Sequence, residues 1–194
     1  VQTCALPISK GNSVAALGSL ESIAAKDTGE TADLALITAH LRRREYDAAL
    51  SAVALLERKL ATKPTAPHLR GLALRGKGDE AGARAAFETA LRFDPRHFAS
   101  VAALAALDQQ GNKPDAARKR LEAAVKLDPT NTSARMTLVS LMEQQQSKPG
   151  EILAAIDEAI SAAPTDAAPR VAKIVQLSHM NDTKAAVSAA QNAM

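Results

Sequence analysis

Aromatic side chains are nearly absent from this sequence of 194 residues: phenylalanine, tyrosine and tryptophan together make up 2%, and there is no tryptophan. A core built on stacked rings is thereby excluded, as is a nucleic-acid surface that presents aromatic platforms to bases. The single cysteine, Cys4, excludes an intramolecular disulfide. No apolar run approaches the ~18 residues that a membrane-spanning helix needs, so no span is expected in this sequence.

An excess of charge of one sign is also missing. The sequence has 24 Lys and Arg residues against 21 Asp and Glu residues, which gives a formal net charge of +3. This balance does not predict a nucleic-acid or anionic-membrane partner. We interpret the basic runs at 42–44 and 118–120 as solvated helix faces and turns; the alternative is a phosphate-binding track.

What the sequence has in abundance is alanine, within an apolar content of 46%. Alanine is the best helix former and has no side-chain rotamers to restrict, although it buries little area. This composition favours closely spaced helices with thin packing layers between them.

Two stretches of the chain are near-copies: GDEAGARAAFETALRFDP begins at Gly78, and GNKPDAARKRLEAAVKLDP begins at Gly111. With a third, less similar copy, their closing prolines are Pro95, Pro129 and Pro164, which lie 129 − 95 = 34 and 164 − 129 = 35 residues apart. A period of this length is typical of stacked helical hairpins, so the sequence predicts an all-α repeat fold.

The repeat that ends at Pro95 shows how each unit is built. Apolar periodicity predicts one helix over about 66–76 and a second over about 80–92. Between them, Gly78 offers a positive φ and Asp79 offers an N-cap for the second helix. Pro95 ends that helix because proline disfavours helical geometry in the residue before it.

These residues resemble the tetratricopeptide repeat (TPR), a helix-turn-helix unit of 34 residues. Small or apolar side chains fall on the family's packing positions in three successive units: Gly71, Ala83, Phe87 and Ala90; then Ala105, Ala117, Leu121 and Ala124; then Leu138, Ile152, Ile156 and Ala159. The turns of the second and third units are expected to be one residue longer. The resemblance implies a right-handed α-solenoid of antiparallel helix-turn-helix TPR units.

Residues 9–194 are interpreted as one TPR array, which divides into a partial unit 9–28, hairpins 30–63, 64–97, 98–131 and 132–166, and a truncated unit 167–194. Residues 1–8, VQTCALPI, resemble the in-frame translation of a sequencing adapter; the alternative is a natural N-terminal arm. Both ends of the array lack a capping helix, which indicates an internal fragment of a longer array. We therefore expect possible end-to-end self-association through the uncapped terminal helices.

Catalytic and metal-binding patterns are not found. His40, His68, His97 and His179 fall in separate hairpins, and none has a second His, Cys or carboxylate at metal-ligand spacing. There is also no nucleophile elbow, no phosphate-binding glycine loop and no Ser-His-Asp or Cys-His grouping. We expect no enzyme activity and no cofactor in this segment.

Function is therefore expected on the concave face, which the first helices of successive repeats line in this family. The register places twelve residues there: Thr38, Arg42, His68, Arg75, Gln109, Gln110, Met136, Ser140, Glu143, Gln144, Ser178 and His179. The Lys and Asn pairs with which some family members clamp a C-terminal carboxylate are absent. The remaining small, apolar and amide side chains suit an extended peptide or a helix of a protein partner, or else the groove is occluded by further repeats or another chain.

The segments HLRRREYDAAL and KPDAARKRLE resemble the long bacterial TPR proteins of PEP-CTERM and exosortase sorting systems, which are predicted lipoproteins encoded near exopolysaccharide loci. This resemblance implies a non-catalytic, envelope-associated or periplasmic scaffold. Two alternatives stay open: the TPR region of a larger enzyme such as a glycosyltransferase, and a cytoplasmic TPR adaptor.

Overall fold

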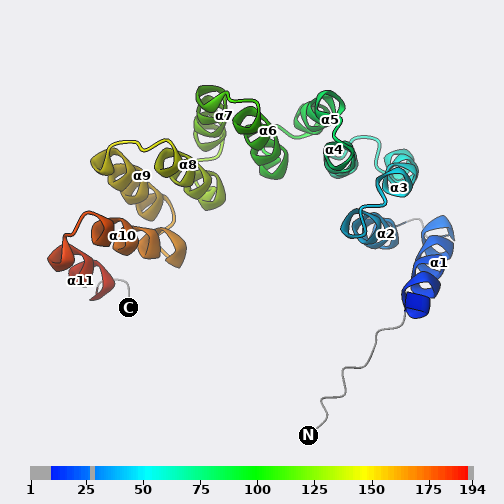
Figure 1. Cartoon of the computed structure of the whole chain (residues 1–194), viewed down its shortest axis with the longest axis horizontal. Coiled ribbons are helices and arrows are strands. Elements are labelled where there is room, and N and C mark those ends of the chain that lie inside the picture. Colours follow the sequence, from blue (N-terminus) through cyan, green and yellow to red (C-terminus); the bar gives the residue numbers. More distant parts are fainter. Residues whose placement is uncertain (1–9, 27–28, 192–194) are drawn as a thin grey trace, which may run out of the picture. The chain divides into compact units, whose positions relative to one another are not determined.

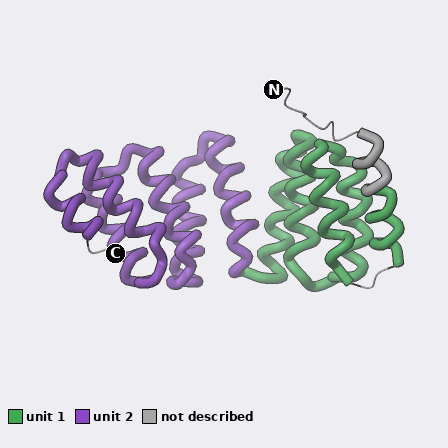
Figure 2. Tube along the Cα trace, turned by 90° about the horizontal axis from the view of Figure 1, so that it is seen from below, with its two compact units in different colours: residues 1–95 green, residues 96–194 purple. Residues whose placement is uncertain are grey.

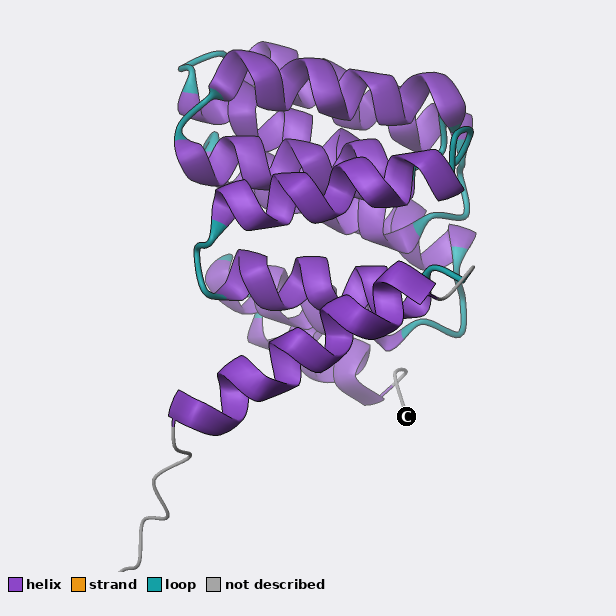
Figure 3. Cartoon of the chain, turned by 90° about the vertical axis from the view of Figure 1, so that its right-hand side faces the viewer, coloured by secondary structure: helices purple, strands orange, loops and turns teal. Residues whose placement is uncertain are grey.

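The fold was obtained as a computed structural model, which describes residues 10–26 and 29–191, with side chains from Leu17 onward. These residues form helices joined by short turns, and no strand occurs among them (Figures 1 and 3). The helices are α1 (Lys10–Lys26), α2 (Thr31–Arg42), α3 (Tyr46–Lys59), α4 (Thr65–Lys77), α5 (Glu80–Phe93), α6 (Phe98–Gln110), α7 (Pro114–Leu127), α8 (Thr132–Gln144), α9 (Pro149–Ala162), α10 (Ala167–His179) and α11 (Thr183–Gln191). The all-α prediction is confirmed.

The chain divides into two compact units, residues 1–95 and residues 96–194 (Figure 2). In the first unit each helix from α1 to α5 packs on the next, and α2 also contacts α4. In the second unit each helix from α6 to α11 packs on the next, α6 contacts α8, and α8 contacts α10. Within each unit the first helices of successive hairpins are thus neighbours. The interpretation of residues 9–194 as one TPR array stays a prediction. Residues 1–8, the suspected adapter sequence, lie outside the described residues.

The inside of the four hairpins from α2–α3 to α8–α9 is filled by one pair of side chains whose sizes compensate. A Cβ atom added to Gly71 on α4 would lie 2.4 Å from Phe87 Cε1 on α5, so this glycine makes room for the ring. The equivalent pairs, 34 or 35 residues away, are Ile37 with Val53, Ala105 with Leu121 and Val139 with Ile156, all buried. On the first helix, glycine is paired with phenylalanine and alanine with leucine, whereas the larger isoleucine and valine are paired with β-branched residues. The burial predicted for Phe87, Leu121 and Ile156 is confirmed.

Each first helix ends in the same left-handed turn. Gly78 has a φ of 84°, and Arg44, Asn112, Gln146 and Asn181 have φ values of 54° to 60°. These residues follow one another at intervals of 78 − 44 = 34, 112 − 78 = 34, 146 − 112 = 34 and 181 − 146 = 35. In every turn the next N–H donates to the carbonyl five residues back, as Asp79 N does to Leu74 O at 3.0 Å. This pattern is a Schellman motif, and only one of its five left-handed residues is glycine.

The structure corrects two details of the predicted register. The second turn is not lengthened, because Asn112 and not Gly111 takes the left-handed conformation, so the turn matches that at Gly78. The third turn is one residue longer, as predicted: α9 begins three residues after Gln146, where other second helices begin two residues after their turn residue. Counting from that turn residue, the equivalent of Gly71 and Ala105 is Val139 and not Leu138.

Ion pairs join neighbouring helices at the edge of the core. Asp33 of α2 is buried and accepts a hydrogen bond from Lys59 Nζ of α3 at 2.6 Å. Asp108 of α6 is also buried and accepts one from Arg120 Nε of α7 at 3.0 Å. Among the described residues, no buried side-chain nitrogen or oxygen lacks a hydrogen-bond partner. No described helix is both long enough and apolar enough to cross a membrane.

Candidate functional site

The residues predicted for the concave face all lie on first helices of hairpins. Thr38, Arg42, His68 and Arg75 lie on α2 and α4 of the first unit, and the other eight lie on α6, α8 and α10 of the second unit. The predicted face is thus divided between the two units, and the larger part is in the second unit.

In the second unit an open cleft with a volume of about 480 Å³ lies between α6 and α8. The cleft is lined by Ala102, Ala105, Ala106, Gln109, Leu121, Ser133, Met136, Thr137, Ser140, Leu141 and Gln144. Four predicted residues are therefore brought together: Gln109, Met136, Ser140 and Gln144. Gln110, Glu143, Ser178 and His179 are exposed but do not line this cleft.

Small side chains on α6 make the cleft possible. Ala102, Ala105 and Ala106 present only methyl groups to it, and Leu121 of α7 lies beneath Ala105 as the hairpin's filling residue. Ala102 and Ala106 were not among the predicted site residues. Ser133 and Thr137 were also missed; they lie three residues before Met136 and Ser140 on α8, so helical spacing from those residues could have identified them.

An amide pair crosses the cleft between the two helices. Gln109 Nε2 of α6 donates to Gln144 Oε1 of α8 at 2.9 Å. Nearby, Thr137 Oγ1 donates to Ser133 O of its own helix at 2.7 Å, so that hydroxyl is already engaged. Directly after the end of α8, Gln145 Nε2 donates to Pro114 O at 3.1 Å and ties this end of the helix to the start of α7.

Among the described residues that line the cleft, none is charged. Two charged residues of the same helices are engaged elsewhere: Asp108 is buried against Arg120, and Arg135 Nε donates to Pro129 O at 2.8 Å while its Nη1 lies 3.5 Å from Glu158. The third, Glu143, is exposed outside the cleft lining. The surface is thus made of methyl, thioether, hydroxyl and carboxamide groups. Such a surface can bury a neutral segment without leaving a charge unpaired.

The predicted residues of the first unit have a different environment. The ring of His68 is half-buried and lies 5.4 Å from the ring of Phe87, centroid to centroid, so it packs on the hairpin core. Thr38, Arg42 and Arg75 are exposed on the surface of α2 and α4. These three stay candidates for partner contact.

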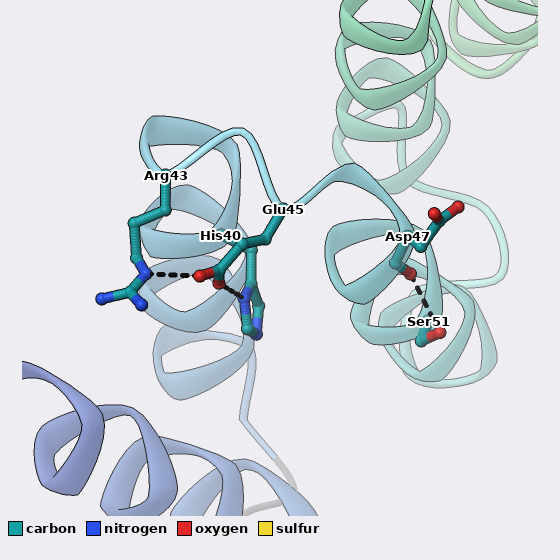
Figure 4. Close-up of polar contacts among 5 residues, drawn as sticks. All are labelled: His40, Arg43, Glu45, Asp47 and Ser51. Atoms are coloured by element: carbon teal, nitrogen blue, oxygen red, sulfur yellow. Dashed lines mark hydrogen bonds and ion pairs between the residues drawn. The ribbon is translucent and has the colours of Figure 1, made fainter.

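The turn between α2 and α3 holds a polar cluster that the sequence did not predict (Figure 4). Glu45 accepts hydrogen bonds from His40 Nδ1 at 2.8 Å and from Arg43 Nε at 2.7 Å. Hydrogen bonding to His40, and secondly to Arg43, lowers the pKa of the Glu45 carboxyl below its ordinary value. In the same view Ser51 Oγ donates to the Asp47 carbonyl at 3.0 Å on α3.

The other histidines are likewise in structural settings. His97 Nδ1 lies 2.9 Å from Ser100 Oγ at the start of α6, and His179 is exposed at the end of α10. Within the described part of the chain, no three His, Cys, Asp or Glu side chains gather as metal ligands would.

Comparison with known proteins supports the fold. The family model of the tetratricopeptide repeat matches residues 101–167, which include α6–α9 almost entirely. Residues 101–167 are tetratricopeptide repeats. The rest of the described chain has the same TPR solenoid fold, since the matches below cover most of its length. A search of curated proteins gives no match.

Several solved TPR structures are similar to the chain. MamA (41-end) from Desulfovibrio magneticus RS-1 has 20% sequence identity and a TM-score of 0.56, with 92% of this chain and 93% of that chain covered. TTC0263 from Thermus thermophilus has 22% identity and a TM-score of 0.61, with 86% and 91% covered. YrrB, described as a TPR protein with an unusual peptide-binding site, has 18% identity and a TM-score of 0.51, with 89% of each chain covered. At these identities the likeness shows the fold alone.

Proposed function

We propose that this TPR chain is a non-catalytic scaffold that binds a segment of a protein partner in the cleft between α6 and α8. The observation that carries this proposal is the uncharged cleft itself, which brings together four residues of the predicted face on two adjacent first helices. Side chains of this kind can exclude water and hydrogen-bond a neutral chain, and the described lining holds no histidine, carboxylate or amine that could act as a general base for its hydroxyl groups.

The comparisons support a partner of this class without naming it. One structural neighbour, YrrB, is described as peptide-binding. Nucleic acid is disfavoured as a partner because the cleft has neither the cations that neutralise phosphates nor an aromatic platform.

The test is peptide selection followed by blocking of the cleft. A displayed library of random peptides would be selected on the whole chain, and the affinity of enriched peptides would be measured by fluorescence anisotropy. Ser140→Arg places a long charged side chain in the cleft, and we expect it to weaken binding at least about tenfold. Ser140 is exposed within a helix, so the substitution should leave the fold intact.

Ala123→Arg is the matched control. Ala123 is exposed on α7 and does not line the cleft, so the same charge is introduced without obstruction. Binding should be unchanged in this variant. The proposal fails if no peptide is enriched, or if enriched peptides bind Ser140→Arg as tightly as the parent chain.

The biological setting is proposed from the sequence resemblance alone: a bacterial envelope-associated scaffold that serves PEP-CTERM sorting or exopolysaccharide assembly. A lipoprotein signal upstream in the parent gene would support this setting. A catalytic domain in the same reading frame would instead identify the TPR region of an enzyme such as a glycosyltransferase, and a parent protein without an export signal would identify a cytoplasmic adaptor. End-to-end self-association stays a prediction, which sedimentation at increasing concentration would test.

A further inference from the structure

We infer that the amide pair Gln109–Gln144 recognises the main chain of the partner, and that the segment bound beside it is extended and uncharged. This inference rests on the proposed function of the α6–α8 cleft and specifies the chemistry of its ligand.

The first step is the hydrogen-bonding capacity that the pair leaves open. Each carboxamide has two N–H donors and one oxygen with two lone pairs. The mutual bond uses one donor of Gln109 and one lone pair of Gln144. Both donors of Gln144 and the whole oxygen of Gln109 therefore stay available, and a peptide unit offers the matching carbonyl acceptor and N–H donor.

The second step is preorganisation. A free glutamine side chain loses rotamer freedom when it binds a ligand, and this loss weakens binding. In this structure the two carboxamides are hydrogen-bonded to each other at 2.9 Å, so their side chains have already lost part of their rotamer freedom before a ligand binds. Two linked amides from adjacent repeats are better placed to bind a peptide unit than one mobile side chain.

The third step concerns charge. Burying an ionised group without a partner is costly, and no side chain that lines the cleft could pair with one. The apolar part of the lining is made by alanine methyl groups, by Leu121 and Leu141, and by the flexible thioether of Met136, which adapts to side chains of different shape. Sequence selectivity is therefore expected to be broad for neutral side chains and strongly against charged ones.

An extended segment can make these hydrogen bonds with the amide pair more readily than a helix can. The backbone N–H and C=O groups of a helix are bonded within the helix, whereas those of an extended chain are free to bind the amide pair. The occupant we infer is thus an extended segment, which the pair contacts through at least one of its peptide units.

Backbone methylation of a selected peptide tests this inference directly. Replacing each peptide N–H in turn by N–CH₃ removes one donor without changing the side chains. We expect one position at which methylation weakens binding to the parent chain at least about tenfold. In Gln109→Leu the unmethylated peptide should bind about tenfold more weakly, and methylation at that position should then change affinity less than about threefold.

Gln110→Leu is the control variant. Gln110 is the adjacent residue on α6, has the same side chain and is exposed outside the cleft. It should retain both the affinity and the sensitivity to methylation, and circular dichroism should show all variants equally helical.

The outcomes separate this inference from the proposed function. A peptide that loses affinity for Ser140→Arg but tolerates methylation at every position would overturn main-chain recognition and keep the cleft as the binding site. Methylation that weakens binding to Gln109→Leu as strongly as to the parent chain would also overturn the inference. Peptides that Ser140→Arg does not affect would refute the proposed function, and the inference with it.

Discussion

The size compensation inside the hairpins predicts that a damaging substitution can be rescued by a second one. Gly71→Ala places a methyl carbon 2.4 Å from Phe87 Cε1, well inside van der Waals contact, so the ring or the helix must move. In the next hairpin the equivalent pair is Ala105 with Leu121, both buried. Phe87→Leu should therefore restore space for the alanine.

The expected magnitudes follow from opposing effects. Overpacking a core typically costs ~1–3 kcal/mol, while replacing a helical glycine by alanine gains ~1 kcal/mol, so Gly71→Ala should destabilise by up to about 2 kcal/mol. Phe87→Leu alone removes buried ring carbons and should cost about 1–2 kcal/mol. In the double variant the methyl group occupies part of the vacated space, so its stability should lie within about 1 kcal/mol of the parent chain. The coupling between the two sites is then about 2 kcal/mol.

Urea-induced unfolding followed by circular dichroism measures these differences, with the slope of the transition compared between variants. Gly18→Ala is the control: a Cβ there meets nothing within 4 Å, so only the propensity gain should appear. If the effects of Gly71→Ala and Phe87→Leu add without coupling, the two side chains do not compete for one space, and the packing argument is refuted.

Three further predictions concern turns and ion pairs. Gln146→Gly should raise the melting temperature by about 2 °C, because it relieves a left-handed φ of 54°, whereas Gln145→Gly, at a φ of −78°, should lower it. Glu45→Gln should destabilise the fold at neutral pH, and this effect should shrink as the pH falls below about 4.3, the ordinary pKa of a glutamate. Because the pKa of Glu45 is lowered in the fold, its stabilising contribution is full above the unfolded pKa and is lost only as the pH falls through the lower folded pKa, as melting curves across pH would show. Lys59→Met should cost about 3 kcal/mol in urea unfolding, since it leaves buried Asp33 unpaired; an unchanged midpoint would contradict this.

The sequence was sufficient to predict the hairpins because the apolar residues of their core recur at helical spacing. The predicted ranges 66–76 and 80–92 differ from α4 and α5 by no more than one residue at each end. Gly78 and Asp79 also behave as predicted, with a positive φ and with Asp79 Oδ1 accepting from Gly82 N at 2.8 Å. The second turn was wrongly predicted to be one residue longer: its left-handed residue is Asn112, while Gly111 has a φ of −78°, so the turn has the same length as that at Gly78. Backbone hydrogen bonds fix that position here, and the four non-glycine residues that occupy it adopt it less favourably than glycine would.

The cleft was harder to predict than the core for a physical reason. Core positions repeat every 34 or 35 residues because each must fill the same space, but the Gln109–Gln144 bond joins residues 144 − 109 = 35 apart in a repeat whose local period is 34. The bond therefore runs diagonally between non-equivalent positions, and repeat alignment alone would have paired Gln109 with Glu143. A diagonal contact depends on the axial offset of α6 and α8, which the direct contact between these two helices and the packing of α7 on α8 hold in place. A substitution in those contacts that shifts α8 along its axis should thus break the amide pair even when both glutamines are unchanged.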